Sequence, residues 1–136
     1  MTIHEFLQGD KFALLAGVEL LETGNGYAKA RMLIKPEHLN GGGVCQGGAI
    51  FTLADLAFAA ATNSHARLTL SITSNINFFK AESKGYLCGE GKEGLSNIKS
   101  SRPSSVMSWV RETQAYLKSF HFFCTTIRQV SGARRL

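Results

Sequence analysis

The clearest pattern in the chain is an alternation of side chains over residues 67–79. One face is mostly apolar and the other is mostly small and polar. The first face holds Leu68, Leu70, Ile72, Ser74, Ile76 and Phe78, and the second holds Thr69, Ser71, Thr73, Asn75, Asn77 and Phe79. A period of two is typical of a β-strand. This segment is therefore predicted to be a strand with one face toward a core.

Weaker patterns predict the elements around this strand. Residues 2–15 place apolar side chains on one helical face, which favours one or two short helical turns. Residues 17–23 and 27–34 predict two strands, and Gly24-Asn25-Gly26 between them is a typical hairpin turn. Residues 86–93 alternate again and predict a further strand. Strands precede and follow a single long helix, so an α+β fold is expected.

That helix covers the segment from Gly47 to Thr62 and is apolar on all sides. The only side chains before Thr62 that are neither small nor apolar are Thr52 and Asp55. A helix of this kind is buried, and an ionisable group inside it is costly unless it is paired or has a task. Asp55 is therefore a candidate functional residue. The other interpretation is a buried carboxyl held by structural partners.

The pattern changes after Gly94. Residues 105–129 contain no Gly, Pro, Asn or Asp, so a hairpin there would lack every usual turn residue. Apolar side chains over residues 106–117 fall near helical spacing, which predicts a helix. Residues 120–127 are rich in aromatic and β-branched side chains and favour a strand.

Length and composition suit one soluble globular domain spanning residues 1–136, with 44% apolar residues and a mean hydropathy near zero. The longest apolar run is too short for a bilayer, and the first ten residues lack the features of a secretory signal. No membrane partner is predicted. Three cysteines are an odd number without pair spacing, which favours a reduced, cytoplasmic setting over a disulfide framework.

The formal net charge of +5 is unevenly spread. Residues 1–96 carry 8 Lys and Arg against 9 Asp and Glu, whereas residues 97–136 carry 7 against 1. This basic region fits either a surface for nucleic acid or an anionic cofactor, or a solvated tail. No aromatic-interleaved nucleic-acid motif accompanies the charge, so we expect no nucleic-acid partner.

The loop and the helix together carry a family resemblance. The segment His38-Leu-Asn-Gly-Gly-Gly-Val-Cys-Gln-Gly-Gly-Ala-Ile-Phe-Thr-Leu-Ala-Asp-Leu-Ala resembles the signature of hotdog-fold acyl-CoA thioesterases of the phenylacetate-degradation type. That signature is Asn, a glycine loop, His-Gly-Gly, and Leu-x-Asp-x-Ala on a central helix. The later Ser74-Asn-Ile-Asn-Phe-Phe-Lys-Ala resembles the strand that follows. The resemblance covers roughly residues 1–93, and it implies an antiparallel sheet wrapped around the helix.

The chain departs from the family pattern twice. Gln46 stands where the family has its histidine. The family also ends in a hairpin with an acidic, Gly-containing turn, and no such hairpin is legible after Gly94. A diverged tail or a reading-frame error would produce this change. Sequencing the encoding DNA separates the two, because the second requires an alternative frame that restores the hairpin pattern.

Thioester hydrolysis needs a group that polarises the carbonyl and a base or nucleophile. The start of the helix supplies the first, since its leading N–H groups lack partners and carry partial positive charge. Gly47 and Gly48 leave these N–H groups unobstructed. Asp55 can supply the second function, either by attacking the carbonyl or by activating a water molecule.

The spacing of these groups predicts a site between two chains. Gly47 and Asp55 are eight residues apart, which is about 12 Å along a helix. They cannot both contact one thioester, but two antiparallel helices could each supply one group. A homodimer would then be the minimal functional unit. The resemblance implies the same arrangement, with two sheets joined edge to edge, often as a dimer of dimers.

Other residues have open interpretations. Asn40 resembles the family's loop asparagine beside the thioester, or is a turn residue. Gln46 could bind the thioester carbonyl or orient a water molecule, but it cannot carry protons at neutral pH. Cys45 lacks a defined histidine partner and is disfavoured as a nucleophile. The polar side chains Thr73, Asn75 and Asn77 could line the acyl groove or face solvent, and Lys80, Lys84 and Arg31 are candidates for CoA phosphates by charge alone.

No cofactor or metal is predicted, because there is no P-loop or dinucleotide fingerprint and the four histidines lack ligand spacing. The favoured function is an acyl-CoA thioesterase with an acyl-CoA substrate. The alternative is a non-catalytic acyl-CoA-binding or regulatory hotdog protein. A pure binding groove gains nothing from a buried carboxylate at Asp55, which weighs against this alternative.

Overall fold

The computed structural model describes residues 2–65, 69–78, 80–93, 106–112 and 120–129. The described part contains short helices α1 (Ile3–Gln8) and α2 (Lys11–Leu15), and a long helix α3 (Gly47–Thr62). It also contains six strands: β1 (Val18–Gly24), β2 (Tyr27–Leu33), β3 (Thr69–Phe78), β4 (Tyr86–Glu93), β5 (Val106–Glu112) and β6 (Phe120–Gln129). Two 3₁₀ turns are also present: η1 (Pro36–His38) precedes the loop that leads into α3, and η2 (Asn63–His65) follows the end of α3.

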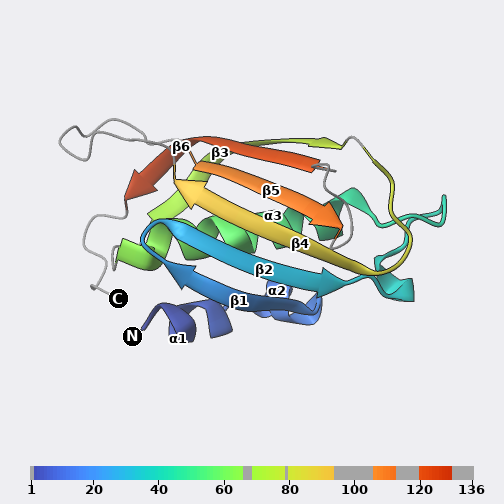
Figure 1. The fold of residues 1–136 in the computed structure, drawn as a ribbon, viewed down its shortest axis with the longest axis horizontal. Coiled ribbons are helices and arrows are strands. Elements are labelled where there is room, and N and C mark those ends of the chain that lie inside the picture. The colour runs from blue at the N-terminus through green and yellow to red at the C-terminus, as the bar shows by residue number, and fades with distance from the viewer. Residues whose placement is uncertain (1, 66–68, 79, 94–105, 113–119, 130–136) are drawn as a thin grey trace.

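The six strands form one antiparallel sheet in the order β1-β2-β4-β5-β6-β3. Figure 1 shows this sheet curving around α3, with α1 and α2 along the edge of the sheet that β1 forms. The sequence prediction of an α+β fold with a sheet wrapped around the central helix is confirmed. None of the described helices is both long enough and apolar enough to cross a membrane.

The core lies between α3 and the inner face of the sheet. β2 alternates as predicted and buries Ala28, Ala30 and Met32 against the helix. Glycines on the central strand β4 allow the helix to approach closely: a Cβ atom at Gly91 would collide with the carbonyl group of Ala57. The small side chains that make α3 apolar throughout therefore also set its distance from the sheet.

Most predicted elements are confirmed, with boundaries shifted by a residue or so. The hairpin between β1 and β2 turns through Asn25 and Gly26, whose φ angles of 53° and 73° suit a primed two-residue turn. β3 lies within the strand predicted over residues 67–79, but its pairing with β6 shifts register on both sides of Thr73. The strict alternation of the sequence is therefore interrupted by an irregularity in the middle of the strand.

The helix predicted over residues 106–117 is wrong over residues 106–112, the part of this range that the structure describes. The residues from Val106 to Glu112 form β5 and not a helix, and β5 pairs with β4 from Val106↔Glu93 to Glu112↔Leu87. β6 confirms the strand expected over residues 120–127, and it pairs with both β5 and β3. The terminal hairpin missing from the sequence pattern is thus present in the backbone. Pairing with neighbouring strands outweighs a weak helical periodicity, and the segment between β5 and β6 lies outside the described residues.

Candidate active site

The loop before α3 is organised by Asn40. Its side-chain Oδ1 accepts hydrogen bonds from the N–H groups of Gly42 at 2.8 Å and Val44 at 3.3 Å. Its backbone closes the same turn, because Asn40 N donates to Val44 O and Gly43 N donates to Asn40 O. Asn40 is therefore a turn residue in this structure. Its Nδ2 group, on an exposed residue, is a hydrogen-bond donor at the rim of the loop.

Buried contacts fix this loop to the rest of the protein. His38 is buried, and its Nδ1 accepts a hydrogen bond from Lys35 N at 3.0 Å while its carbonyl accepts from Gln46 N. Cys45 N donates to Glu82 O in the segment between β3 and β4. The start of α3 is thereby held at one position relative to η1 and to that segment.

The leading N–H groups of α3 differ in their hydrogen bonds. Gln46 is the N-cap residue: its Oε1 accepts from Gly48 N, and its carbonyl accepts from Ala49 N at 3.0 Å and Ile50 N at 3.3 Å. No hydrogen bond within the described part of the chain involves the N–H of Gly47. The group predicted to polarise a carbonyl is thus available, whereas the N–H of Gly48 is already bound by Gln46.

Asp55 lies on the side of α3 that faces away from the sheet. Leu53, Ala54 and Ala57 are buried toward the strands, whereas Asp55 is half-buried, as are the residues one turn to either side of it, Phe51 and Ala59. Burial raises the pKa of the Asp55 carboxyl, and the nearby charge of Asp10 raises it further. A carboxylate with a raised pKa is a stronger base than an ordinary one at the surface.

Gly47 and Asp55 occupy the first turn and the middle of one regular helix. Their separation of eight residues corresponds to about 12 Å along the axis. The structure therefore keeps these two groups apart within one chain. A half-buried strip that includes Phe51, Asp55 and Ala59 runs along the helix, and it carries apolar side chains on either side of the carboxyl.

The substrate-binding candidates of β3 lie on two faces. Asn75 and Asn77 are exposed, and Asn77 Nδ2 donates to Asn75 Oδ1 at 3.4 Å. They alternate with Ile76, which packs against the core, and with Phe78. The side chain of Thr73 lies outside the described part. The two asparagines therefore face away from α3, and their role in binding stays a prediction.

Lys80 lies beside the loop, just after β3. Its Nζ group forms an ion pair with Glu82 Oε1 at 2.6 Å, and the backbone carbonyl of Glu82 binds Cys45 N. Lys80 is thus held near the start of α3 by a mostly buried carboxylate. Arg31 lies elsewhere, since it pairs with Glu19 and stacks over Tyr86 on strands β1, β2 and β4.

Cys45 has the character of a core residue. Its side chain is buried, and burial raises the pKa of its thiol, which disfavours the reactive thiolate. Within the described ranges, no three His, Cys, Asp or Glu side chains gather closely enough to hold a metal ion.

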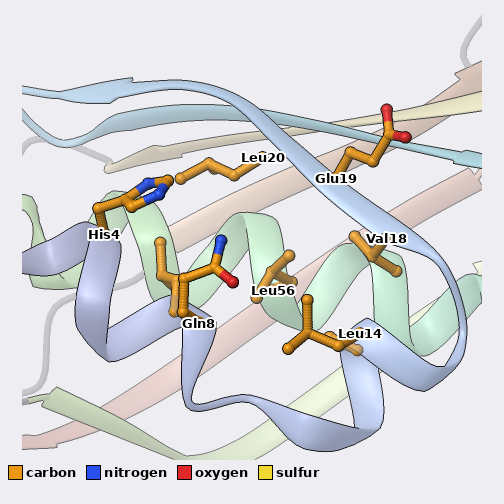
Figure 2. A pocket seen from close by; sticks show the side chains of 9 residues that line it. His4, Gln8, Leu14, Val18, Glu19, Leu20 and Leu56 are labelled. Carbon is orange, nitrogen blue, oxygen red and sulfur yellow. The ribbon is translucent and has the colours of Figure 1, made fainter.

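A cavity of about 200 Å³ lies between the two N-terminal helices, β1 and α3 (Figure 2). Its walls are mostly apolar and come from α1, α2, β1 and α3, with Leu56 on the helix; the residues are His4, Leu7, Gln8, Ala13, Leu14, Val18, Glu19, Leu20 and Leu56. Asp55 and the Gly47 loop do not line it. The candidate site of a single chain thus lies on the half-buried face of α3 and not in this cavity.

One neighbour of the site was missed by the sequence analysis. A Cβ atom at Gly47 would lie 3.0 Å from Cζ of Phe78, so the tip of that ring points at the first residue of α3. The alternation of β3 placed Phe78 on the apolar face, and nothing in the sequence linked it to a residue 31 positions earlier.

The arrangement of a curved antiparallel sheet around one long helix is the hotdog fold. The PaaI protein of Escherichia coli, described as part of the phenylacetic acid degradation operon, superposes with a TM-score of 0.84 at 22% identity, over 95% of this chain and 91% of that one. This likeness concerns the fold. No family model matches the chain.

Two curated proteins are similar in sequence. A protein named putative esterase from Archaeoglobus fulgidus is 49% identical over 87 residues, which are 63% of this chain and 56% of the relative. The acyl-coenzyme A thioesterase PaaI of Escherichia coli is 32% identical over 77 residues, 57% of this chain and 55% of the relative. The chain spans about half the length of the curated relatives it matches. The resemblance to thioesterases of the phenylacetate-degradation type is confirmed by these matches.

Proposed function

We propose that this protein is an acyl-CoA thioesterase, which hydrolyses an acyl-CoA to a free acid and CoA. The observation that carries the proposal is the pairing of two features on one helix. The N–H group of Gly47, the first residue of α3, makes no hydrogen bond within the described part of the chain, whereas the N–H groups of the next three residues all donate to Gln46. The second feature is the half-buried carboxyl of Asp55, whose pKa is raised. The similarity to a named acyl-CoA thioesterase supports the same chemistry.

In the proposed mechanism, the thioester carbonyl oxygen accepts a hydrogen bond from Gly47 N–H. Negative charge develops on this oxygen when the carbonyl carbon is attacked, and the N-terminal end of the helix stabilises that charge. Asp55 either removes a proton from the attacking water or attacks the carbonyl itself. In both cases the C–S bond breaks, and the CoA thiolate leaves and takes up a proton. When water has attacked, the free acid forms directly; when Asp55 has attacked, water then hydrolyses the acyl–Asp55 anhydride, which releases the acid and restores the carboxylate.

The proposed site lies between two copies of the chain. Gly47 of one copy and Asp55 of the other would face one thioester across antiparallel α3 helices, because about 12 Å of helix separates the two groups within a chain. The half-buried apolar strip beside Asp55 supports such a contact, because a second copy would cover the part of it that a single chain leaves accessible. β3 is an edge strand of the described sheet, which supports an edge-to-edge dimer.

The remaining candidates would act around these two groups. Gln46 would hold the helix start in place through its bond to Gly48 N. Asn40 Nδ2 would donate to the substrate from the rim of the loop. Lys80 would attract the CoA phosphates while paired with Glu82. Asn75 and Asn77 would contact the substrate only where it passes the outer edge of β3.

The test is hydrolysis of a panel of acyl-CoAs by the wild type and by Asp55→Asn. We expect kcat to fall by about 10²–10⁴-fold, the usual contribution of a general base. Glu22→Gln, which removes an exposed carboxylate on β1, is the matched control and should keep full activity. Equal rates for the wild type and Asp55→Asn would refute the assignment of the base.

One observation favours a second function, that of a non-catalytic acyl-CoA-binding protein. Gln46 stands where hotdog thioesterases of the phenylacetate-degradation type have a histidine, and its side-chain oxygen already accepts a hydrogen bond from Gly48 N at the start of the helix. Binding of acyl-CoA by the wild type, with no release of free thiol from any member of the panel, would establish this alternative in place of hydrolysis.

A further inference from the structure

Phe78 lies close to the residue whose amide is proposed to polarise the carbonyl. It is the last residue of β3, and its ring points toward the start of α3. A Cβ atom at Gly47 would lie 3.0 Å from Cζ and 3.5 Å from both Cε atoms of this ring. The ring therefore lies next to the residue whose N–H is proposed to bind the thioester carbonyl.

The ring also remains partly accessible. Phe78 is 50% exposed although it contacts the helix start, whereas the previous inward residue of the strand, Ile76, packs against the core. A half-exposed aromatic ring next to an available N–H can both contact a ligand and keep water away from it. Excluding water strengthens the interaction between the N–H group and a developing oxyanion.

We infer that Phe78 is a specificity-determining residue, which restricts the site to acyl-CoAs that are unbranched at the carbon next to the carbonyl. This inference rests on the proposed function. The thiol side of the carbonyl is the same sulfur atom and CoA arm in every acyl-CoA, so the acyl side is where substrates differ. A rigid ring beside the carbonyl leaves room for a straight chain and collides with a methyl branch at the adjacent carbon.

The test compares butyryl-CoA with isobutyryl-CoA, which have the same number of carbon atoms. We expect the wild type to prefer butyryl-CoA at least tenfold in kcat/KM. Phe78→Ala should reduce this preference to within about threefold, and Phe78→Leu should give an intermediate value, because one methyl group in or out of a pocket changes kcat/KM by about 10–200-fold. The ratio is independent of the fraction of folded enzyme, so simple destabilisation cannot change it.

Leu70→Ala is the matched control. Leu70 lies on the same strand, is also 50% exposed and pairs with β6, but it lies at the opposite end of β3 from Gly47. Its ratio should equal that of the wild type. Sedimentation of all variants at one protein concentration reports whether the copies stay together. If Phe78→Ala dissociates, the ratio of Phe78→Leu decides the question.

The possible failures are distinct. If the wild type hydrolyses neither substrate nor any other acyl-CoA, the proposed function is wrong. If the wild type is active but accepts both substrates equally, or if the Phe78 variants keep the wild-type ratio, the thioesterase stands and the role of Phe78 is refuted.

Discussion

Replacing Gly91 by Ala tests whether the close contact between β4 and α3 sets the position of the helix. A Cβ atom there would meet the carbonyl oxygen of Ala57, lie 2.9 Å from the carbonyl carbon, and lie 3.2 Å from Cβ of Ala61. Backbone atoms cannot rotate away as a side chain can, so α3 or β4 must move. Overpacking of a core costs roughly 1–3 kcal/mol, and we expect Gly91→Ala at the upper end, about 3 kcal/mol.

Alanine substitutions at two other glycines provide reference values for the loss of stability expected at Gly91. A Cβ atom at Gly89 would lie 3.1 Å from Leu53 Cγ and 3.3 Å from the backbone oxygen of Leu53, which are looser contacts than those at Gly91, so Gly89→Ala should cost only about 1 kcal/mol. Gly41 has nothing within 4 Å of the added atom, and Gly41→Ala should stay within about 0.5 kcal/mol of the wild type.

Urea unfolding followed by circular dichroism, at one protein concentration, measures all three free energies of unfolding. Thermal unfolding should give Gly91→Ala a Tm roughly 10 °C below that of the wild type. A loss at Gly91 no larger than that at Gly41, or a larger loss at Gly89 than at Gly91, would show that the helix does not lie where the structure places it.

Two further outcomes follow from polar side chains at Asp55, which is half-buried, and at Asn63, which is buried. Because the pKa of Asp55 is raised in the folded protein, folding favours the protonated form, and the ionised carboxyl lowers stability as the pH rises above the usual Asp range. Asp55→Asn should therefore be more stable than the wild type at pH 7, with the difference vanishing near pH 3; a less stable variant at pH 7 contradicts this. Asn63 is 1% exposed and bonds Ala59 O, Thr69 O and Thr69 N, so Asn63→Ala should lower the free energy of unfolding by about 2–4 kcal/mol. A loss below 1 kcal/mol in urea unfolding would mean that these bonds are not formed.

The part of the fold that could be predicted from the sequence is the part in which local pattern and tertiary contacts agree. α3, β2 and the hairpin at Gly26 follow from uniform apolarity, alternation and turn residues. β5 could not be predicted, because its conformation comes from pairing with β4, and the residues of β5 also fit a helical period.

The candidate site was predicted in outline for a similar reason. Gly47 and Asp55 stand out along the chain, since a glycine at a helix start and a carboxyl in an apolar helix are local signals. The capping bond of Gln46 and the ring of Phe78 depend on three-dimensional placement. Phe78 reaches Gly47 only because β3 ends beside the start of α3, and no residue spacing encodes that contact.

The strand order also constrains when the protein can fold during synthesis. β3 is synthesised before β4, yet its neighbour in the sheet is β6. Phe78 can therefore pair only after Phe120 has been synthesised, and Thr69 only after Gln129 has been synthesised. At about 5–20 residues per second the ribosome needs roughly 2–12 s to supply that neighbour. During this interval β3 has no strand to pair with on its own chain, and a polypeptide that stops before β6 never acquires one. The N-terminal hairpin can form early, whereas the edge of the sheet beside the candidate site is completed last.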